Sequence, residues 1–256
     1  MRQRLRELWD YREVLLNLVR KELKVKYIGS VLGAVWSLLN PVVFLAVFTF
    51  VAKVLGASVD DYPVFLLSGL LAWNLFAVSL STGAQSVVAN ANLVKKVYFP
   101  RIFLPLASVG ALLVDLAFSL LLQAVLMLKY HWHLTTSVLL LPVFIFGTVM
   151  SAAGLGMILS AVNVRFRDVK YVVPFMIQMG IFLTPVIYPV RYIPQKWMLL
   201  MGLNPMAGMV IGFRHALLGS QAPWSVIGLS FAVSISMFFF GLYFFRRMER
   251  HFADVI

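Results

Sequence analysis

The chain has 256 residues, of which 61% are hydrophobic and only 12% are charged. A soluble domain carries about a quarter charged residues, so this composition excludes an ordinary water-soluble domain and predicts a protein solvated by lipid. The chain has no cysteine, which excludes disulfides and cysteine-based metal sites. The net charge of +12 is typical of the Lys and Arg excess that membrane proteins keep on the cytoplasmic side, so nucleic-acid binding is not expected.

Residues 4–27 form the first predicted element, an amphipathic helix rather than a membrane span. At 100° per residue, the polar side chains gather on one face and the apolar ones on the other. The polar face holds Arg6, Asp10, Glu13, Asn17, Arg20, Lys21 and Lys24, and the apolar face holds Leu8, Tyr11, Leu15, Leu18 and Val19. Such a helix lies in the membrane interface. It serves there either as a lipid anchor alone or as a collar that also touches a cytoplasmic partner.

Six later segments meet the requirement of about 20 mostly apolar residues for a membrane-spanning helix. They run over Val31–Ala52, Pro63–Val88, Ile102–Leu128, Leu134–Val162, Tyr171–Val190 and Pro223–Phe245. No internal repeat is visible, so we expect one all-α integral membrane domain over residues 1–256. Its parts are the interface helix in 1–30, spans one to five in 31–190, an outer segment in 191–221, and the sixth span with a basic C-terminus in 222–256.

The basic residues predict the orientation of these spans. With the N-terminus in the cytoplasm, 17 of the 22 Lys and Arg residues fall on the cytoplasmic side. The five that fall outside are Lys53, Lys129, Arg191, Lys196 and Arg214. We therefore expect a multi-pass protein with both termini in the cytoplasm.

The outer segment 191–221 is too apolar for a free loop and too broken for a span. Its two apolar pieces, Gln195–Leu203 and Met206–Leu218, have lengths typical of re-entrant or interfacial helices. Pro205 is placed to start the second helix, where its missing N–H has no partner to lose. The segment is either a gate over a pore exit or a static shelf that stabilises a dimer. The gate candidates are Pro185, Pro189, Pro194, Asn204, Pro205 and Arg214.

Asp115 is the only acid within a predicted span, near the middle of the third. A carboxylate at that depth costs about 2.5–3.5 kcal/mol on insertion scales, so it needs a proton, water or a hydrogen-bond partner. No basic residue lies at comparable depth in another span, which favours a structural or cavity-facing role over proton coupling. Asn40 and Asn74 pose the same question in milder form, and Pro41 should kink the first span.

Aromatic side chains recur at helical spacing in the first and fifth spans. Two interpretations are open: bulk that faces lipid or the membrane interface, or a stacking surface for sugar rings inside a pore. The candidates for pore or substrate contact are Trp36, Asn40, Phe44, Phe48, Phe175, Met179, Phe182 and Tyr188.

Motifs for enzymatic chemistry of the chain's own are missing from the sequence. No glycine is followed by Lys and then Ser or Thr, so there is no Walker A nucleotide site, and neither metalloprotease nor hydrolase signatures occur. His131 and His133 flank Trp132 in a short outer loop without a nearby carboxylate, which favours solvated side chains over a metal site. We therefore expect no cofactor and no metal in this chain.

Several motifs resemble, in order along nearly the whole chain, those of the ABC-2 type polysaccharide export permeases. Arg20–Tyr27 (RKELKVKY) resembles their entry, and Asn92–Pro100 (NLVKKVYFP) resembles their first cytoplasmic loop. The most specific stretch is Thr184–Pro189 (TPVIYP), followed by Asn204-Pro205-Met206. Within the family, the pattern is most similar to the membrane subunit of O-antigen exporters, with the teichoic-acid and capsule export permeases as near relatives.

The resemblance implies a half-transporter of the bacterial inner membrane with no nucleotide site of its own. Two copies would form the pore, and two copies of a cytoplasmic ATPase would bind ATP and Mg²⁺ below it. The substrate would be a polysaccharide on a polyprenyl pyrophosphate lipid. The residues implied in coupling to the ATPase are Asn92, Leu93, Val94, Lys95, Lys96, Tyr98, Arg20 and Lys24. The alternatives are an exporter of teichoic acid, capsule, small lipids or drugs, and a polyprenyl-phosphate membrane enzyme.

Overall fold

The structure, a computed structural model, describes residues 11–28, 35–56, 59, 61–166 and 168–252, and only the backbone at 35–37 and 251. Some expectations fall outside these ranges: the first turns of the amphipathic helix, Arg2, Arg4, Arg6 and Arg167, and the side chain of Trp36. Within these ranges every regular element is helical, as the sequence predicts.

Four of the described helices are long and apolar enough to cross a membrane. They are α4 (Tyr62–Ala89), α6 (Phe103–Lys129), the continuous pair η1 (Thr136–Leu140) and α7 (Leu141–Arg165), and α11 (Trp224–Met248). They match the second, third, fourth and sixth predicted spans. The first and fifth predicted spans correspond to α3 (Val35–Val54) and α8 (Val169–Leu183), whose described apolar stretches are shorter. The chain is thus a multi-pass membrane protein.

Helix α8 ends at Leu183, so the predicted extension of the fifth span to Val190 is wrong. Thr184 precedes Pro185, and a residue before proline is pushed out of the helical region of backbone space. The φ of -111° and ψ of 140° at Thr184 are accordingly extended. Pro185 and Pro189 also lack the N–H groups that a continued helix needs. The proline-rich stretch therefore sets a defined end to α8.

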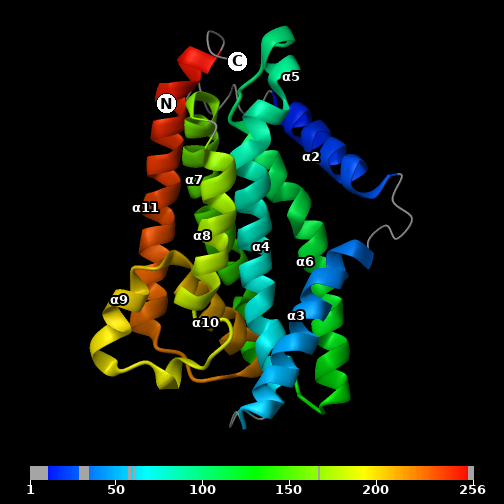
Figure 1. The fold of residues 1–256 in the computed structure, drawn as a ribbon, viewed down its shortest axis with the longest axis vertical. Coiled ribbons are helices and arrows are strands. Elements are labelled where there is room, and N and C mark those ends of the chain that lie inside the picture. Colours follow the sequence, from blue (N-terminus) through cyan, green and yellow to red (C-terminus); the bar gives the residue numbers. More distant parts are fainter. Residues whose placement is uncertain (1–10, 29–34, 57–58, 60, 167, 253–256) are drawn as a thin grey trace.

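Helix α4 is the central helix, with α6, α7 and α10 (Pro205–Leu218) packed around it (Figure 1). The closest approach of two neighbouring helices uses glycine. A Cβ added to Gly154 of α7 would lie 2.7 Å from the backbone of Met237 in α11, and one added to Gly241 of α11 would lie 2.3 Å from the Gly154 carbonyl oxygen. Because lipid is as apolar as leucine, membrane helices associate through such close packing of small residues.

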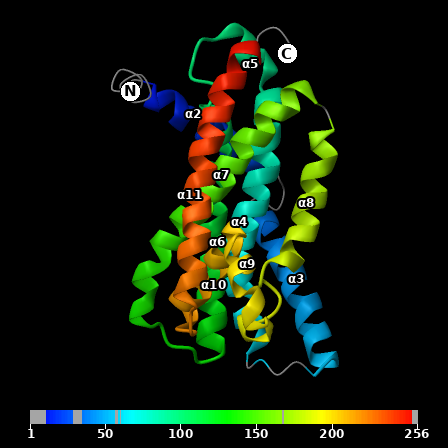
Figure 2. The same cartoon turned by 90° about the vertical axis from the view of Figure 1, so that its left-hand side faces the viewer.

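The outer segment contains η2 (Val190–Tyr192), η3 (Gln195–Trp197), α9 (Met198–Gly202) and α10. The first predicted apolar piece forms η3 and α9, and the second forms α10, which begins at Pro205 as predicted. Gly219, with a φ of 63°, terminates α10 in the left-handed conformation that suits glycine. Figure 2 shows α9 and α10 in the half of the molecule opposite α5 (Ala91–Lys96) and the C-terminus.

Helix α2 (Arg12–Tyr27), α5 and the C-terminal turn η4 (Glu249–His251) lie at the same end of the molecule (Figures 1 and 2). The turn between α7 and α8 lies there too. These segments carry the described basic residues that are expected in the cytoplasm. An apolar cluster built around Leu18, Val94, Phe99, Phe245 and Phe252 holds this end together.

The glycine contact between α7 and α11 predicts a sharp difference between two substitutions in one helix. Gly241→Leu should force the helices apart and destabilise the chain by about 3 kcal/mol, the upper range for overpacking. Gly228→Leu is the matched control, because nothing lies within 4 Å of a Cβ added there. Thermal melting in detergent measures both. Equal melting temperatures for the two variants would contradict the packing described.

Candidate coupling face, membrane cavities and outer clamp

Helix α5 is a short helix between α4 and α6, where the sequence places a cytoplasmic coupling element. Its surface divides into an exposed and an anchored part. Asn92, Lys95, Lys96 and Tyr98 are exposed, with Tyr98 at 81% exposure. Val94 is 5% exposed and packs in the apolar cluster at this end, so it anchors α5 and is not available to a partner, contrary to its inclusion among the coupling residues. Leu93 is half-buried against the same cluster.

Helix α2 lies beside this face and is tied to it by a side-chain hydrogen bond. Lys21 Nζ donates to Asn90 Oδ1. Asn90 is buried between the end of α4 and the start of α5, and its Nδ2 donates to the Ser86 carbonyl oxygen at 2.8 Å. The predicted coupling residues Arg20 and Lys24 are exposed on α2. No local pattern in the sequence marks the Lys21–Asn90 contact, because its partners lie 69 residues apart along the chain.

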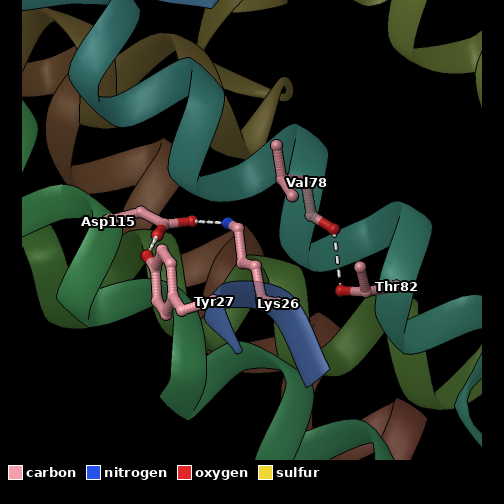
Figure 3. A network of polar contacts seen from close by, with 5 residues as sticks. All are labelled: Lys26, Tyr27, Val78, Thr82 and Asp115. Atoms are coloured by element: carbon pink, nitrogen blue, oxygen red, sulfur yellow. Dashed lines mark hydrogen bonds and ion pairs between the residues drawn. The ribbon is translucent and has the colours of Figure 1, made fainter. Parts of the chain in front are cut away.

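Two partners of Asp115 come from the end of α2 (Figure 3). Lys26 Nζ forms an ion pair with Asp115 Oδ2, and Tyr27 OH donates to Asp115 Oδ1. The side chain of Asp115 is 17% exposed and that of Lys26 is 37% exposed. The base that pairs with Asp115 therefore comes from α2 and not from another span. The pairing supplies the hydrogen-bond partners that a carboxylate within a span needs.

A cavity of ≈ 200 Å³ adjoins this pair and is lined by several polar groups of the membrane helices. Its lining includes Lys26, Asn40, Asn74, Asp115 and Ser119, with Pro41 and several leucines. Three residues singled out separately in the sequence, Asn40, Asn74 and Asp115, thus meet in one place. Ionisable groups within a membrane protein face its interior or a water-filled cavity, and this cavity supplies such a setting.

The aromatic pore candidates fall into two separate groups. On α3, Phe44 and Phe48 stack with ring centroids 5.8 Å apart, and Phe44 is exposed. On α8, Phe175, Met179 and Phe182 are exposed. Phe175 and Met179 line an apolar cavity of ≈ 710 Å³ that shares no lining residue with the polar cavity beside Asn40. One copy of the chain therefore does not bring the two groups together.

The outer segment is fastened to the membrane helices by its polar groups. Asn204 Oδ1 accepts from Met206 N at 2.9 Å, which caps α10, while its Nδ2 donates to Thr184 Oγ1 at 2.9 Å. Ser230 of α11 completes the junction, because its Oγ accepts from Gly208 N at 3.0 Å and donates to the Asn204 carbonyl oxygen at 2.8 Å. Pro205 begins a helix whose residues are almost all buried.

Arg214 forms the centre of an outer clamp, which we define as its guanidinium and the backbone carbonyls around it. The side chain is 3% exposed although the sequence placed it outside the membrane. Its Nη1 and Nη2 donate to the carbonyl oxygens of Pro185 and Val186. Its Nε donates to the Phe65 carbonyl oxygen at 3.4 Å, and the Phe65 ring centroid lies 3.6 Å from Cζ. Arg214 thus ties α10 to α4 and to the stretch after α8.

The other gate candidates lie along this stretch with different exposures. Pro185 is buried, Pro189 is half-buried and Pro194 is exposed. Tyr188 is half-buried, and its OH donates to the Phe182 carbonyl oxygen at 3.1 Å, which bridges the turn after α8. A pocket of ≈ 420 Å³ at this end is lined by Pro189, Arg191 and Arg214. The clamp is therefore fixed on one side and borders open volume on the other.

Removal of the clamp has a predictable effect on stability. Arg214→Leu leaves buried carbonyls without donors and should lower the free energy of unfolding by about 3 kcal/mol. Arg214→Lys should recover only part of this, because an ammonium cannot reproduce the planar fork of a guanidinium. Lys53→Ala, at an exposed site on α3, is the control. Thermal melting in detergent compares the variants, and an Arg214→Leu protein as stable as the control would refute the clamp.

Comparison with known proteins identifies the family. A model of the ABC-2 type transporter family matches residues 13–218. The chain is 32% identical over 256 residues to the O-antigen export system permease protein RfbA of Myxococcus xanthus, covering 98% of both chains. It is 30% identical over 248 residues to the protein of that name from Klebsiella pneumoniae, covering 95% of both. The polysialic acid transport protein KpsM of Escherichia coli matches at 23% identity, over 90% of this chain and 91% of KpsM. The family model covers most of the sequence, and the chain therefore belongs to the ABC-2 type transporter family.

Proposed function

We propose that this chain is the membrane subunit of an ABC exporter that carries a lipid-linked O-antigen-type polysaccharide across the bacterial inner membrane. The observation that carries the proposal is the 30–32% identity, over nearly the full length, to O-antigen export permeases. The exposed face of α5 supports it, because a permease without a nucleotide site needs a surface on which an ATPase can act. In this proposal ATP and Mg²⁺ bind to that partner, and the permease itself is not an enzyme.

The proposed assembly holds two copies of this chain and two copies of the ATPase. In each copy α3 and α8 complete six spans, and both termini face the cytoplasm, as the basic end of the molecule favours. The exposed aromatic faces of α3 and α8 support a second copy, because opposing copies would bring the α3 group of one near the α8 group of the other. A pore lined in this way offers aromatic rings to the apolar C–H faces of sugars. Membrane lipid would cover the remaining apolar surface.

Export of capsule polysaccharide is the second candidate, since KpsM matches over 90% of this chain. Its lower identity of 23%, against 32% for the relative from Myxococcus xanthus, ranks it behind O-antigen. Teichoic-acid, small-lipid and drug export, and a polyprenyl-phosphate enzyme, rank lower still.

The proposal predicts where the polymer accumulates when the chain is removed. Deletion in the native bacterium should leave polysaccharide on its polyprenyl pyrophosphate carrier inside the cell and remove it from the surface, and the wild-type chain should reverse both effects. Polymer is measured by surface labelling and by extraction of the lipid-linked pool. Surface polymer that persists after deletion would contradict the export role. Loss of capsule instead of O-antigen would favour the second candidate.

A variant of α5 is predicted to lose export without losing membrane insertion, and the same measurements of polymer test it. Lys95→Glu/Lys96→Glu reverses two exposed charges while the buried anchors Val94 and Phe99 stay in place. Export should fall at least tenfold, and less ATPase should copurify, while the amount of inserted permease stays unchanged. Lys129→Glu, at the opposite end of the molecule, is the matched control.

We further propose that α9 and α10 are re-entrant helices and that the gate is residues 190–203, with α10 as its fixed support. α10 is buried and held by the outer clamp, so a joint between it and Tyr188 is a poor place for motion. Residues in 190–203 are mostly exposed, and Trp197, Leu200 and Met201 border the apolar cavity, which leaves room for movement. The remaining alternative is a static shelf that stabilises the dimer.

A disulfide between α9 and α11 tests the gate. The Cβ that Gly202 would gain lies 3.2 Å from Leu229 Cβ, close to the spacing of bonded cysteines, and the chain has no cysteine of its own. Oxidised Gly202→Cys/Leu229→Cys should assemble and bind ATP but export at less than a tenth of the rate, and reduction should restore export. Each single cysteine serves as a control. If the oxidised protein exports as fast as the reduced protein, the static shelf remains as the explanation.

A further inference from the structure

Helix α2 contacts two distant parts of the molecule through charged side chains on one continuous helix. Near its middle, Lys21 reaches Asn90 at the junction of α4 and α5. At its end, Lys26 and Tyr27 reach Asp115, twelve residues into α6, which is about 18 Å along that helix. Figure 1 shows α2 sloping away from the end that carries α5, on the side of the molecule where α6 lies. The helix thus spans the distance between the proposed ATPase contact and the centre of the membrane region.

We propose that α2 is a rigid link that carries movement of α5 to Asp115, so that Lys21, Lys26, Tyr27 and Asp115 are positioning residues for ATP-driven export. The proposal rests on the proposed function and deepens it, because it names the route by which a cytoplasmic ATPase acts on the membrane helices. The Lys21–Asn90 contact is the input of the link, and the Lys26–Tyr27–Asp115 cluster is its output.

The input responds directly to α5. Asn90 stands at the end of α4 and immediately before α5, and it is buried at 7% exposure. Its Nδ2 donates to the Ser86 carbonyl oxygen, and its Oδ1 accepts from Lys21 Nζ. A displacement of the α4–α5 junction therefore moves the acceptor of Lys21.

The body of the link is stiff and in close contact with α6. Residues 12–27 form one helix without proline or glycine, so the two lysines keep a fixed separation of five residues, about 7.5 Å along the axis. Leu18 is buried, and Val19 lies against Gly110 of α6, where an added Cβ would come within 3.2 Å of its Cγ2. A displacement of Lys21 is accordingly transmitted along α2 to Lys26.

The output opens onto α3, which carries aromatic pore candidates. The polar cavity beside the ion pair is lined by Asp115 and Ser119 of α6, Asn74 of α4, and Asn40 and Pro41 of α3. A shift of Asp115 changes this lining and hence the support of α3 around Pro41. Figure 3 shows the pair meeting across the gap between α2 and α6.

The test uses the complete exporter with its ATPase in liposomes and measures polymer moved per ATP hydrolysed. Asp115→Asn removes the charge with little change of shape, and Lys21→Met removes the input. Each should lower transport per ATP at least tenfold while ATPase association stays within twofold of wild type. The double variant should be no worse than the worse single one, because both act on one route. Exchange of the charges, Lys26→Asp/Asp115→Lys, should restore at least a third of the wild-type ratio. Glu13→Gln, exposed in the first turn of α2, is the control.

A second readout needs no polymer. Spin labels at Val47→Cys in α3 and Leu121→Cys in α6, both exposed positions, should report an ATP-dependent change of distance in the wild type that Asp115→Asn abolishes. Where Asp115→Asn fails to fold, Tyr27→Phe removes only a hydroxyl and should give a loss of about threefold in transport per ATP. Variants that keep the wild-type ratio and distance change overturn the link. The link is also overturned if the losses of transport per ATP in Asp115→Asn and Lys21→Met add up in the double variant, which would indicate two independent structural defects. A wild-type complex that shows the distance change but moves no polysaccharide would overturn the proposed substrate and leave the link standing.

Discussion

The backbone carbonyl groups of the irregular stretch that follows α8 need donors from within the protein, and Arg214 supplies donors to those of Pro185 and Val186. Lipid offers no hydrogen bonds, so irregular backbone at membrane depth persists only where protein or enclosed water satisfies it. The proline-rich stretch after Leu183 breaks the helix, and the guanidinium, carried on a neighbouring helix, closes the break. Because a guanidinium presents several donors in one plane, a single residue binds the turn, α10 and α4 at once. The whole outer end of the molecule is arranged around this one side chain.

The same constraint explains the polar groups deeper in the bundle. Asp115 has its partners on α2, and Asn163 Nδ2 donates to the Ala84 carbonyl oxygen at 3.0 Å. Buried Ser151 donates to Ser234 Oγ at 2.8 Å, between α7 and α11. Each of these polar groups joins two helices. The contacts therefore specify which helices pack together, whereas apolar side chains could pack equally well against other apolar helices. The glycine contacts then fix how closely those neighbours approach.

Helix length, hydropathy and proline position allowed much of the fold to be predicted. Twenty or more apolar residues identified α4, α6, α7 and α11, and Asn204-Pro205 located the start of α10. The end of α8 was not predicted, because apolar residues continue past Thr184. The helix nevertheless stops there, because Pro185 keeps the residue before it out of the helical conformation. Val94 was misassigned because a six-residue helix is too short for its buried side to be read from periodicity. The two α2 partners of Asp115 lie 88 and 89 residues away along the chain, and the carbonyl partners of Arg214 lie 26 to 149 residues away. No local pattern encodes contacts of that kind.

The contact between Ser230 and the start of α10 has a consequence for biogenesis. The N–H of Gly208 and the carbonyl of Asn204 find their partner on α11, which follows α10 in the chain. During translation, α10 therefore leaves the ribosome before the residue that satisfies its backbone exists. The start of α10 therefore gains these backbone partners only once α11 is in place, and quality control that senses unpaired backbone would act on it until then.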